Sequence, residues 1–280
     1  MTNEMQQAPE AGDDGEDETS AGAVPDHIKA QYPDRAFFEY RELFLRHLMR
    51  DLSGRVHTQQ DQPVPTCLDV GCNAGRYTAM LARHGFAARG MDFSAALVAE
   101  ARAAHPELAF DQGDAQDLPY ADGSFDAVAS VGLLQCLPDW KFALAEAVRV
   151  LKPGGTALIE TNRALPLWEN ALKTAAYMAR RQLTPREAAA LFRVHRLGAD
   201  RPIGQGLRKF ARQELLDWVT TLPVRTVVIH DPRKHRIFHD YMWAVVLVKR
   251  GADQENVEPG ISECAHCRRY GVVRVRGGRG

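Results

Sequence analysis

CLDVGCNAGRYTAMLARHG, at residues 67–85, is the segment that decides the fold. It begins as an apolar run, turns at two glycines and continues in a pattern typical of a helix. Strand, glycine turn and helix in this order form a unit that holds a nucleotide at the carboxyl end of a parallel strand. Gly71 can adopt a positive φ angle and, without a Cβ, lets a ligand approach the backbone. Gly75 gives the same freedom where the helix begins.

Two other nucleotide-binding loops agree poorly with the residues of the turn. A dinucleotide fingerprint needs G-x-G-x-x-G, but Asn73 stands where the second glycine belongs, and the helix opens with Arg76 and Tyr77. A phosphate-binding loop needs Gly-Lys-Ser/Thr after the turn, and this chain has none there. The turn is therefore a weak match to the dinucleotide fingerprint and does not match the phosphate-binding loop.

Strand and helix patterns alternate beyond this segment. Seven runs have the composition of strands: 66–71, 88–93, 108–114, 125–132, 155–162, 225–231 and 241–249. Helical patterns separate most of the early runs, which predicts right-handed crossovers and an α/β fold with a mostly parallel sheet and helices on both faces. The last two runs are close in the sequence, so we expect them to pair antiparallel. A further amphipathic helix is predicted over 34–52.

The composition suggests one folded domain between two tails. Residues 1–25 are acidic and polar, with almost nothing to bury, and predict a disordered tail. The folded domain is expected over 26–250, with a helix-rich insertion at 163–213. From 251 to 280 the chain reads as a flexible tail that ends rich in Arg and Gly.

Charge and cysteine content narrow the class of protein. The formal net charge of −1 gives no general attraction to nucleic acid or to an anionic membrane. No apolar stretch approaches the roughly 18 residues of a membrane helix, and the polar N-terminus is unlike a secretory signal. Five cysteines, an odd number, suit a reducing cytoplasm better than a disulfide scaffold. We therefore expect a cytoplasmic protein.

Acidic residues also end the second and third predicted strands. Asp92 lies about twenty residues beyond the turn, where a carboxylate can accept hydrogen bonds from ribose hydroxyls, and Phe93 beside it can stack on a purine. After the third strand, Asp114 can accept from an adenine amino group while the Ala115 amide meets a ring nitrogen. Any one such Asp is more often a helix cap or turn former. Their order after a G-x-x-x-G turn indicates an adenosine ligand.

These motifs together resemble the class I S-adenosylmethionine-dependent methyltransferases. LDVGCNAGRYTAMLARHG, GMDFS, GDAQDLPYADGSFDAVAS, VGLLQCLPD and AVRVLKPGG occur in the family's order over residues 66–160. They are most similar to the branch that methylates small molecules, which includes the ubiquinone and menaquinone enzymes. The resemblance implies a Rossmann-like methyltransferase fold with a seven-stranded sheet. One departure is Asn73, where the family commonly has glycine. Because Asn tolerates left-handed backbone, we expect binding to survive.

The resemblance also implies S-adenosylmethionine as the cofactor. The cofactor-binding positions would be Asp69, Gly71, Cys72, Asn73, Gly75, Asp92, Phe93, Asp114, Ala115 and Val131. The turn would line the methionine part, with Asp69 supporting the turn, while Asp92 would hold the ribose. Asp114 and Ala115 would hold the adenine, and Val131 or Gly132 would pass close to the sulfonium. A sulfonium cation is better tolerated near carbonyls and acidic groups than near clustered Lys.

The acceptor is less well marked in the sequence. Transfer from a sulfonium is an in-line displacement that needs alignment and exclusion of water, so no conspicuous catalytic residue is required. After the fourth strand the chain lacks the Pro-Pro-Tyr of nucleobase methylases. Gln135, where relatives often carry His, either orients the acceptor or is merely solvated. His195 is a candidate base or a structural histidine. The insertion at 163–213 falls where small-molecule relatives have a lid.

The C-terminal motif CAHC, at 264–267, has the spacing of half a zinc site. Since no second pair of ligands lies near it in the sequence, we expect no metal there.

Three functions remain open on the sequence alone. The first is a methyltransferase acting on a small metabolite at O, N or C. The second is a partner or assembly protein that binds S-adenosylmethionine without catalysis, although intact Asp92 and Asp114 argue against it. The third is an RNA or protein methyltransferase guided by the basic tail. It predicts that deleting 251–280 abolishes activity. We expect a small-molecule partner, no membrane and no nucleic acid.

Overall fold

The computed structural model describes residues 35–57, 63–162, 209–230, 242–251, 258–265 and 267. The side chains are described from Phe44 onward in the first range and from Trp243 onward in the fourth. The predicted acidic tail and the predicted insertion up to residue 208 lie outside the described residues, as does the chain beyond 267. No helix in the described ranges has both the length and the apolar character needed to cross a membrane.

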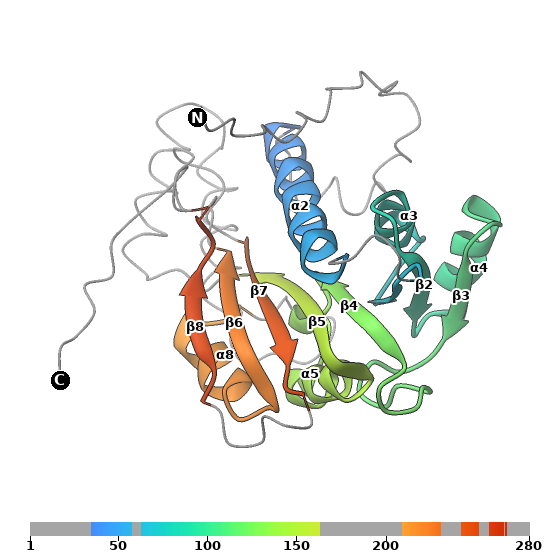
Figure 1. Ribbon diagram of the computed structural model, residues 1–280. Coiled ribbons are helices and arrows are strands. Elements are labelled where there is room, and N and C mark those ends of the chain that lie inside the picture. The colour runs from blue at the N-terminus through green and yellow to red at the C-terminus, as the bar shows by residue number, and fades with distance from the viewer. Residues whose placement is uncertain are drawn as a thin grey trace, which may run out of the picture. The chain divides into compact units, whose positions relative to one another are not determined.

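The described strands form one mixed sheet of eight strands, in the order β3-β2-β1-β4-β5-β7-β6-β8 (Figure 1). Their bounds are Thr66–Val70 (β1), Ala87–Asp92 (β2), Ala109–Gln112 (β3), Phe125–Val131 (β4), Leu151–Asn162 (β5), Val224–His230 (β6), Met242–Lys249 (β7) and Gly260–Glu263 (β8). β3, β2, β1, β4 and β5 run parallel, and β7 is antiparallel to both β5 and β6. The predicted parallel sheet and the antiparallel last pair are confirmed.

The eighth strand corrects the predicted count of seven. β8 pairs parallel with β6 inside the segment predicted to be a tail. No strand pattern is visible in the sequence there because β8 has four residues, of which Gly260, Ile261 and Ser262 are exposed and only Glu263 is partly covered. A short edge strand buries too little apolar surface to produce an alternating pattern.

Helices lie between the strands as predicted. Their bounds are Arg35–Val56 (α2), Arg76–Arg83 (α3), Ala95–Ala104 (α4), Trp140–Arg149 (α5) and Arg212–Val219 (α8), with a short 3-10 turn at Leu134–Cys136 (η2). α2 confirms the predicted amphipathic helix, since Leu45, Leu48 and Leu52 on it are fully buried. Figure 1 shows α5 and α8 apart from α2. Side chains of α5 and α8 share one core with the central strands.

That core closes over the carboxyl end of β5. Trp140 on α5 contacts Phe210 edge to face, with ring centroids 5.2 Å apart, and both side chains are buried. The Phe210 amide donates to the carbonyl oxygen of Asn162, the last residue of β5, at 3.0 Å. The chain therefore leaves the sheet after Asn162 and returns to it at Phe210, which is hydrogen-bonded to Asn162. Residues 163–208 form the connection between these two points.

Candidate cofactor and acceptor site

The bend after β1 has three residues in left-handed backbone. The φ angles are 79° at Gly71, 52° at Asn73 and 85° at Gly75. The Asn73 side chain supports this conformation, because its Oδ1 accepts from the Ala74 amide at 2.7 Å. The Gly71 and Cys72 amides both donate to the carbonyl oxygen of one β2 residue, at 2.8 and 3.0 Å. The predicted tolerance of Asn for this conformation is confirmed.

Both glycines of the bend are required by space as well as by backbone angle. A Cβ on Gly71 would lie 2.9 Å from Cδ1 of Leu133, in the loop after β4. A Cβ on Gly75, which caps the amino end of α3, would lie 2.8 Å from Cζ of Phe110. Any side chain at either position thus meets a packed neighbour in addition to an unfavourable φ.

Asp69 lies on β1 directly before the bend and is almost fully buried. Its Oδ2 accepts from the Thr78 hydroxyl of α3 at 2.7 Å, which joins the strand to the helix around the turn. Burial raises the pKa of Asp69 from its ordinary value of 3.8 to about 7, and the negative charge of Asp92 adds to this rise. Supporting the turn is therefore a role that the geometry of Asp69 allows.

Asp92 ends β2 and binds the bend from its other side. Its Oδ2 accepts from the Asn73 amide at 2.9 Å, and its Oδ1 accepts from the Ser94 amide at 3.0 Å. The Phe93 side chain beside it is 76% exposed, so its ring presents an apolar surface at the edge where Asp92 ends the strand. A ribose contact for Asp92 and a purine contact for Phe93 were predicted from the sequence. The positions of both residues are compatible with these contacts, which stay predictions.

The electrostatic field at the bend is negative. Burial raises the pKa of the Cys72 thiol well above its usual range, and the charges of Asp69 and Asp92 raise it further. The thiol is therefore neutral, and it lies beside the Asp92 carboxylate and beside Asp69, which is only partly ionised near pH 7. Such a site favours a cationic ligand and disfavours a phosphate, in agreement with the exclusion of phosphate-binding loops from the sequence.

The loop after β3 begins at the same edge. Asp114 Oδ1 accepts from the Gln116 amide at 2.9 Å, and Ala115 is buried. The Asp114 carboxylate thus shapes the start of the loop as an Asx turn, the ordinary role of such a residue. Its predicted role toward an adenine stays a prediction.

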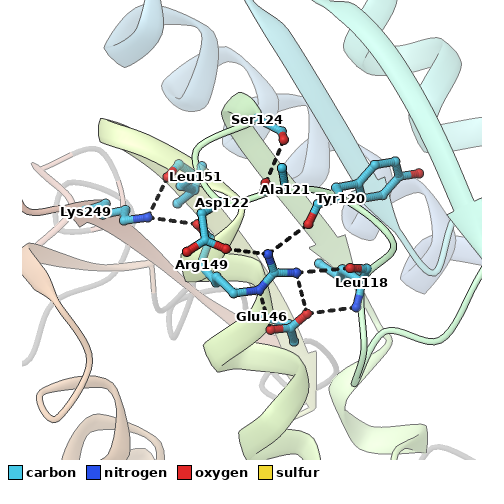
Figure 2. A network of polar contacts seen from close by, with 9 residues as sticks. All are labelled: Leu118, Tyr120, Ala121, Asp122, Ser124, Glu146, Arg149, Leu151 and Lys249. Carbon is cyan, nitrogen blue, oxygen red and sulfur yellow. Dashed lines mark hydrogen bonds and ion pairs between the residues drawn. The ribbon is translucent and has the colours of Figure 1, made fainter.

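Arg149, the last residue of α5, holds the remainder of this loop (Figure 2). Its guanidinium donates to the carbonyl oxygens of Leu118 at 3.0 Å and Tyr120 at 2.8 Å, and to the Asp122 carboxylate at 2.7 Å. Glu146, one turn earlier, accepts from Arg149 at 2.6 Å and from the Leu118 amide at 2.8 Å. One charged pair on α5 therefore fixes the course of the loop.

Further contacts hold the same region. The Tyr120 hydroxyl and the Arg89 guanidinium both donate to Asp111 Oδ2, at 2.7 and 2.6 Å. Lys249 on β7 donates to the carbonyl oxygens of Arg149 at 2.9 Å and Leu151 at 2.6 Å (Figure 2). This network could not be predicted from the sequence, because its members are distant along the chain and each has the pattern of an ordinary surface residue.

The edge beyond β4 and β5 is the predicted acceptor side. Val131 is buried, and Gly132 after it has a φ of 70° and donates its amide to the Glu160 carbonyl oxygen at 3.1 Å. Gln135 on η2 is partly buried, and its Oε1 accepts from the Thr161 hydroxyl at 3.2 Å and from the Asn162 amide at 3.0 Å. Gln135 is thus tied to the end of β5 rather than merely solvated.

Other residues of this edge were not singled out in the sequence. Glu160 on β5, level with Val131, is a buried carboxylate. Lys209 lies next to Phe210, and burial lowers its pKa from 10.5 to about 8. The sequence did contain a signal for each residue. Glu160 is an acidic residue within an apolar run, and Lys209 is a lysine near the end of the predicted insertion. His195 lies outside the described residues.

The topology explains why these groups share one edge. β1 pairs with β2 on one side and with β4 on the other, so the order of the strands reverses at β1. Ligands of open α/β sheets bind beyond the carboxyl ends of strands at such a switch point. The bend, Asp92, Asp114 and Val131 all follow the carboxyl ends of the strands around it.

Comparison with known proteins agrees with this site. A family described as "Methyltransferase domain" matches residues 68–159. A demethylmenaquinone methyltransferase from Beutenbergia cavernae is 30% identical over 220 residues, which cover 78% of this chain and 80% of that protein. A phthiotriol/phenolphthiotriol dimycocerosates methyltransferase from Mycobacterium tuberculosis is 36% identical over 147 residues, 50% of this chain and 53% of that protein.

Among solved structures, the CurJ carbon methyltransferase has a TM-score of 0.54 and 12% identity, and the match covers 74% of this chain and 54% of that chain. At this identity the likeness is one of fold. The similarity over most of the Beutenbergia cavernae protein, together with the family match over the bend and the four strands that follow it, establishes the family. The chain belongs to the S-adenosylmethionine-dependent methyltransferases, and its methyl donor is S-adenosylmethionine.

Proposed function

We propose that this chain transfers a methyl group to an O, N or C atom of a small-molecule metabolite, beneath a lid formed by its insertion. The observation that carries the proposal is the negative bend held by Asp92 at the switch point of the sheet. The acceptor would enter on the far side of the bend, between η2 and the end of β5.

The described residues fit S-adenosylmethionine. Gly71 and Gly75 hold the bend in left-handed backbone packed against Leu133 and Phe110, and Asp92, together with Asp69 when it is ionised, supplies the negative field that suits a sulfonium. In this proposal Asp92 holds the ribose hydroxyls, and the exposed Phe93 ring covers one face of the adenine. When bound, the cofactor supplies an activated methyl group.

The protein's own contribution is alignment and exclusion of water. Aligning two reactants within contact distance lowers the barrier without a charged catalyst. Leu133 packs against the bend, and Val131 is buried beside it, so the wall that would flank the reacting atoms is apolar. In our proposal this wall keeps water from the reacting atoms.

Gln135 is the candidate for orienting the acceptor. Because residues of β5 donate hydrogen bonds to the side-chain oxygen Oε1 of Gln135, the orientation of this side chain is fixed. With Oε1 bound in this way among the described residues, the side-chain amide nitrogen of Gln135 can donate to an oxygen of the acceptor. A fixed donor of this kind positions a substrate without taking up a proton, so we propose Gln135 as an orienting group. His195 remains the candidate base in the insertion.

The position of the insertion supports a lid. Its two ends meet at the hydrogen bond between Phe210 and Asn162, and the Asn162 amide in turn donates to Gln135. A segment of about 45 residues that leaves and returns at the acceptor edge is well placed to cover it.

The names of the two relatives, a demethylmenaquinone and a phthiotriol/phenolphthiotriol dimycocerosates methyltransferase, favour a small-molecule acceptor over a macromolecule. The test uses S-adenosylmethionine labelled in its methyl group, with a metabolite extract, total RNA and total protein offered separately. Label in the metabolite fraction that is lost in Asp92→Ala supports the proposal.

The alternatives give different outcomes in the same experiment. Label confined to RNA or protein, and lost on removing residues 268–280, would support a macromolecular acceptor guided by the basic tail. Binding of S-adenosylmethionine by calorimetry without transfer to any fraction would favour a non-catalytic partner. Either result would contradict the proposed function.

A further inference from the structure

Four metal-ligating side chains meet at the end of the sheet opposite to β3. His47 comes from α2, His230 ends β6, and Cys264 and Cys267 follow β8. One ligand atom from each lies within 4.8 Å of all the others. Three of the four side chains are buried and His47 is partly so. The CAHC motif, which lacked partners in the sequence, thus acquires two histidines in the fold.

The distances match those of a tetrahedral centre. Cys264 Sγ lies 3.6 Å from His47 Nε2, and Cys267 Sγ lies 3.8 Å from His230 Nδ1. Zinc–sulfur bonds of about 2.3 Å and zinc–nitrogen bonds of about 2.0 Å, at tetrahedral angles, put sulfur and nitrogen about 3.5 Å apart. These two sulfur–nitrogen pairs are therefore spaced nearly as zinc ligands, and the remaining ligand atoms lie within 4.8 Å of one another.

A carboxylate lies beside the other ring nitrogen of one of the ligands. The other ring nitrogen of His230, Nε2, lies 3.3 Å from Asp51 Oδ2. Arg55 in turn donates to both Asp51 oxygens, at 2.6 and 3.2 Å. A histidine that binds a metal through one nitrogen commonly gives its other N–H to a carboxylate. Asp51 stands one helical turn from His47, so α2 supplies both a ligand and this supporting carboxylate.

We propose that His47, His230, Cys264 and Cys267 bind one Zn²⁺ ion in a closed, structural site. Two thiolates and two imidazoles form a donor set that zinc takes in structural sites. Four protein ligands leave no position open for a substrate, so the ion would act on the fold and not on the reaction.

The position in the sheet agrees with a structural role. His230, Ala244, Glu160 and Val131 are register partners in successive strands. At about 4.8 Å per strand, three steps separate His230 from Val131 by about 14 Å. The site is therefore too far from the methyl-transfer edge at Val131 to touch the reacting atoms.

The proposed ion also explains how β8 is held. β8 is a short, mostly exposed edge strand, and its attachment to β6 continues with the bond from the Cys264 amide to the Ile229 carbonyl oxygen at 2.9 Å. Arg212 adds a contact of 2.9 Å to Glu263. Such contacts alone stabilise little, whereas a structural zinc contributes directly to folding. The ion would join the end of the chain to α2 and β6.

The test is the zinc content of the full-length, tag-free protein after dialysis, measured by elemental mass spectrometry. We expect about one zinc per chain for the wild type and for Cys136→Ser, a matched control at an exposed cysteine on η2. Cys264→Ser and His230→Ala should lose most of the metal. A wild-type protein without stoichiometric zinc, or variants that keep it, would overturn the proposal.

A second measurement does not depend on the variants folding. Removing the metal from the wild type with a chelator should lower its thermal midpoint, and adding Zn²⁺ alone should restore it. Replacement by Co²⁺ should give the visible absorption of a tetrahedral thiolate site. An unchanged midpoint on chelation, or an octahedral cobalt spectrum, would contradict the assignment.

Discussion

The carboxylate of Asp92 accepts a hydrogen bond from the backbone amide of Asn73 at 2.9 Å. This bond joins the carboxyl end of β2 to the bend that follows β1, so the residue expected to hold the ribose also holds the loop expected to carry the methionine part. Asn73 completes the arrangement with its own side chain, which accepts from the Ala74 amide. The two halves of the expected cofactor site are thereby coupled.

The first prediction concerns Asn73. Asn73→Gly keeps the left-handed conformation and the bond from its amide to Asp92, so S-adenosylmethionine affinity should stay within about threefold of the wild type. Asn73→Val places a β-branched residue at a φ of 52° and should cost about 1–2 kcal/mol of stability. Calorimetric titration and thermal unfolding of both variants check this. Equal affinity for S-adenosylmethionine and equal thermal stability of the two variants would contradict this prediction.

The second prediction concerns the loop after β3. Arg149→Ala removes two carbonyl partners and two carboxylate partners at once (Figure 2). We expect a loss of about 2–3 kcal/mol in the free energy of unfolding, because hydrogen bonds to charged groups contribute about this much. Denaturant titration measures it, with Arg83→Ala as the control at an exposed arginine on α3. A loss no greater than that of the control would refute this role.

The third prediction is a pH dependence that arises from Asp69. Its folded-state pKa of about 7 lies above its ordinary value of 3.8. Between these values the folded chain binds more protons than the unfolded chain, so this group lowers stability as the pH rises from about 4 to about 7, and its effect is constant above that. Asp69→Asn should therefore gain on the wild type across this window, by at most about 4 kcal/mol.

Asp126 provides the contrast for that measurement. Burial raises the pKa of Asp126, but hydrogen bonds from Lys152 and Thr66 lower it by more, and the net shift is downward. Its stabilising effect is lost only as the pH falls below about 4. The stability difference between the wild type and Asp126→Asn should thus stay constant from pH 5 to 7. The same constancy for Asp69→Asn would show that Asp69 does not titrate in this range.

The fourth prediction concerns Gln135 and rests on the proposed function. Gln135→Ala should reduce kcat/KM for the acceptor at least about tenfold while the affinity for S-adenosylmethionine stays within about twofold, because its contacts lie at the end of β5 and not at the bend. Cys136→Ser, at an exposed neighbour on the same turn, is the control. Parallel loss of both quantities in Gln135→Ala would indicate a structural role only.

The sequence predicted those parts of the molecule that are local. The turn at 71–75, the acidic strand ends at Asp92 and Asp114 and the alternation of strands with helices each depend on residues close to one another in the chain. For the same reason the seven predicted strands are all present. Short-range patterns of this kind record backbone conformation and amphipathic faces.

The missing parts depend on contacts between distant residues. β8 has no periodic pattern, and Arg149 reads as a helix-terminal charge until its partners in the preceding loop are placed. The cluster at Cys264 needs His47 from more than 200 positions earlier, and no local spacing signals such a pair. Predicting these features requires the fold itself.

The central claim is that Asp92 and the bend bind S-adenosylmethionine, and calorimetric titration of Asp92→Ala tests it most directly. Asp126→Ala is the matched control, because Asp126 also accepts hydrogen bonds, from Thr66 and from Lys152, but lies at the opposite edge of the sheet. We predict that Asp92→Ala loses at least about tenfold in affinity, which corresponds to about 1.4 kcal/mol, while Asp126→Ala binds like the wild type. An Asp92→Ala protein that is folded and binds as tightly as the wild type would contradict the account.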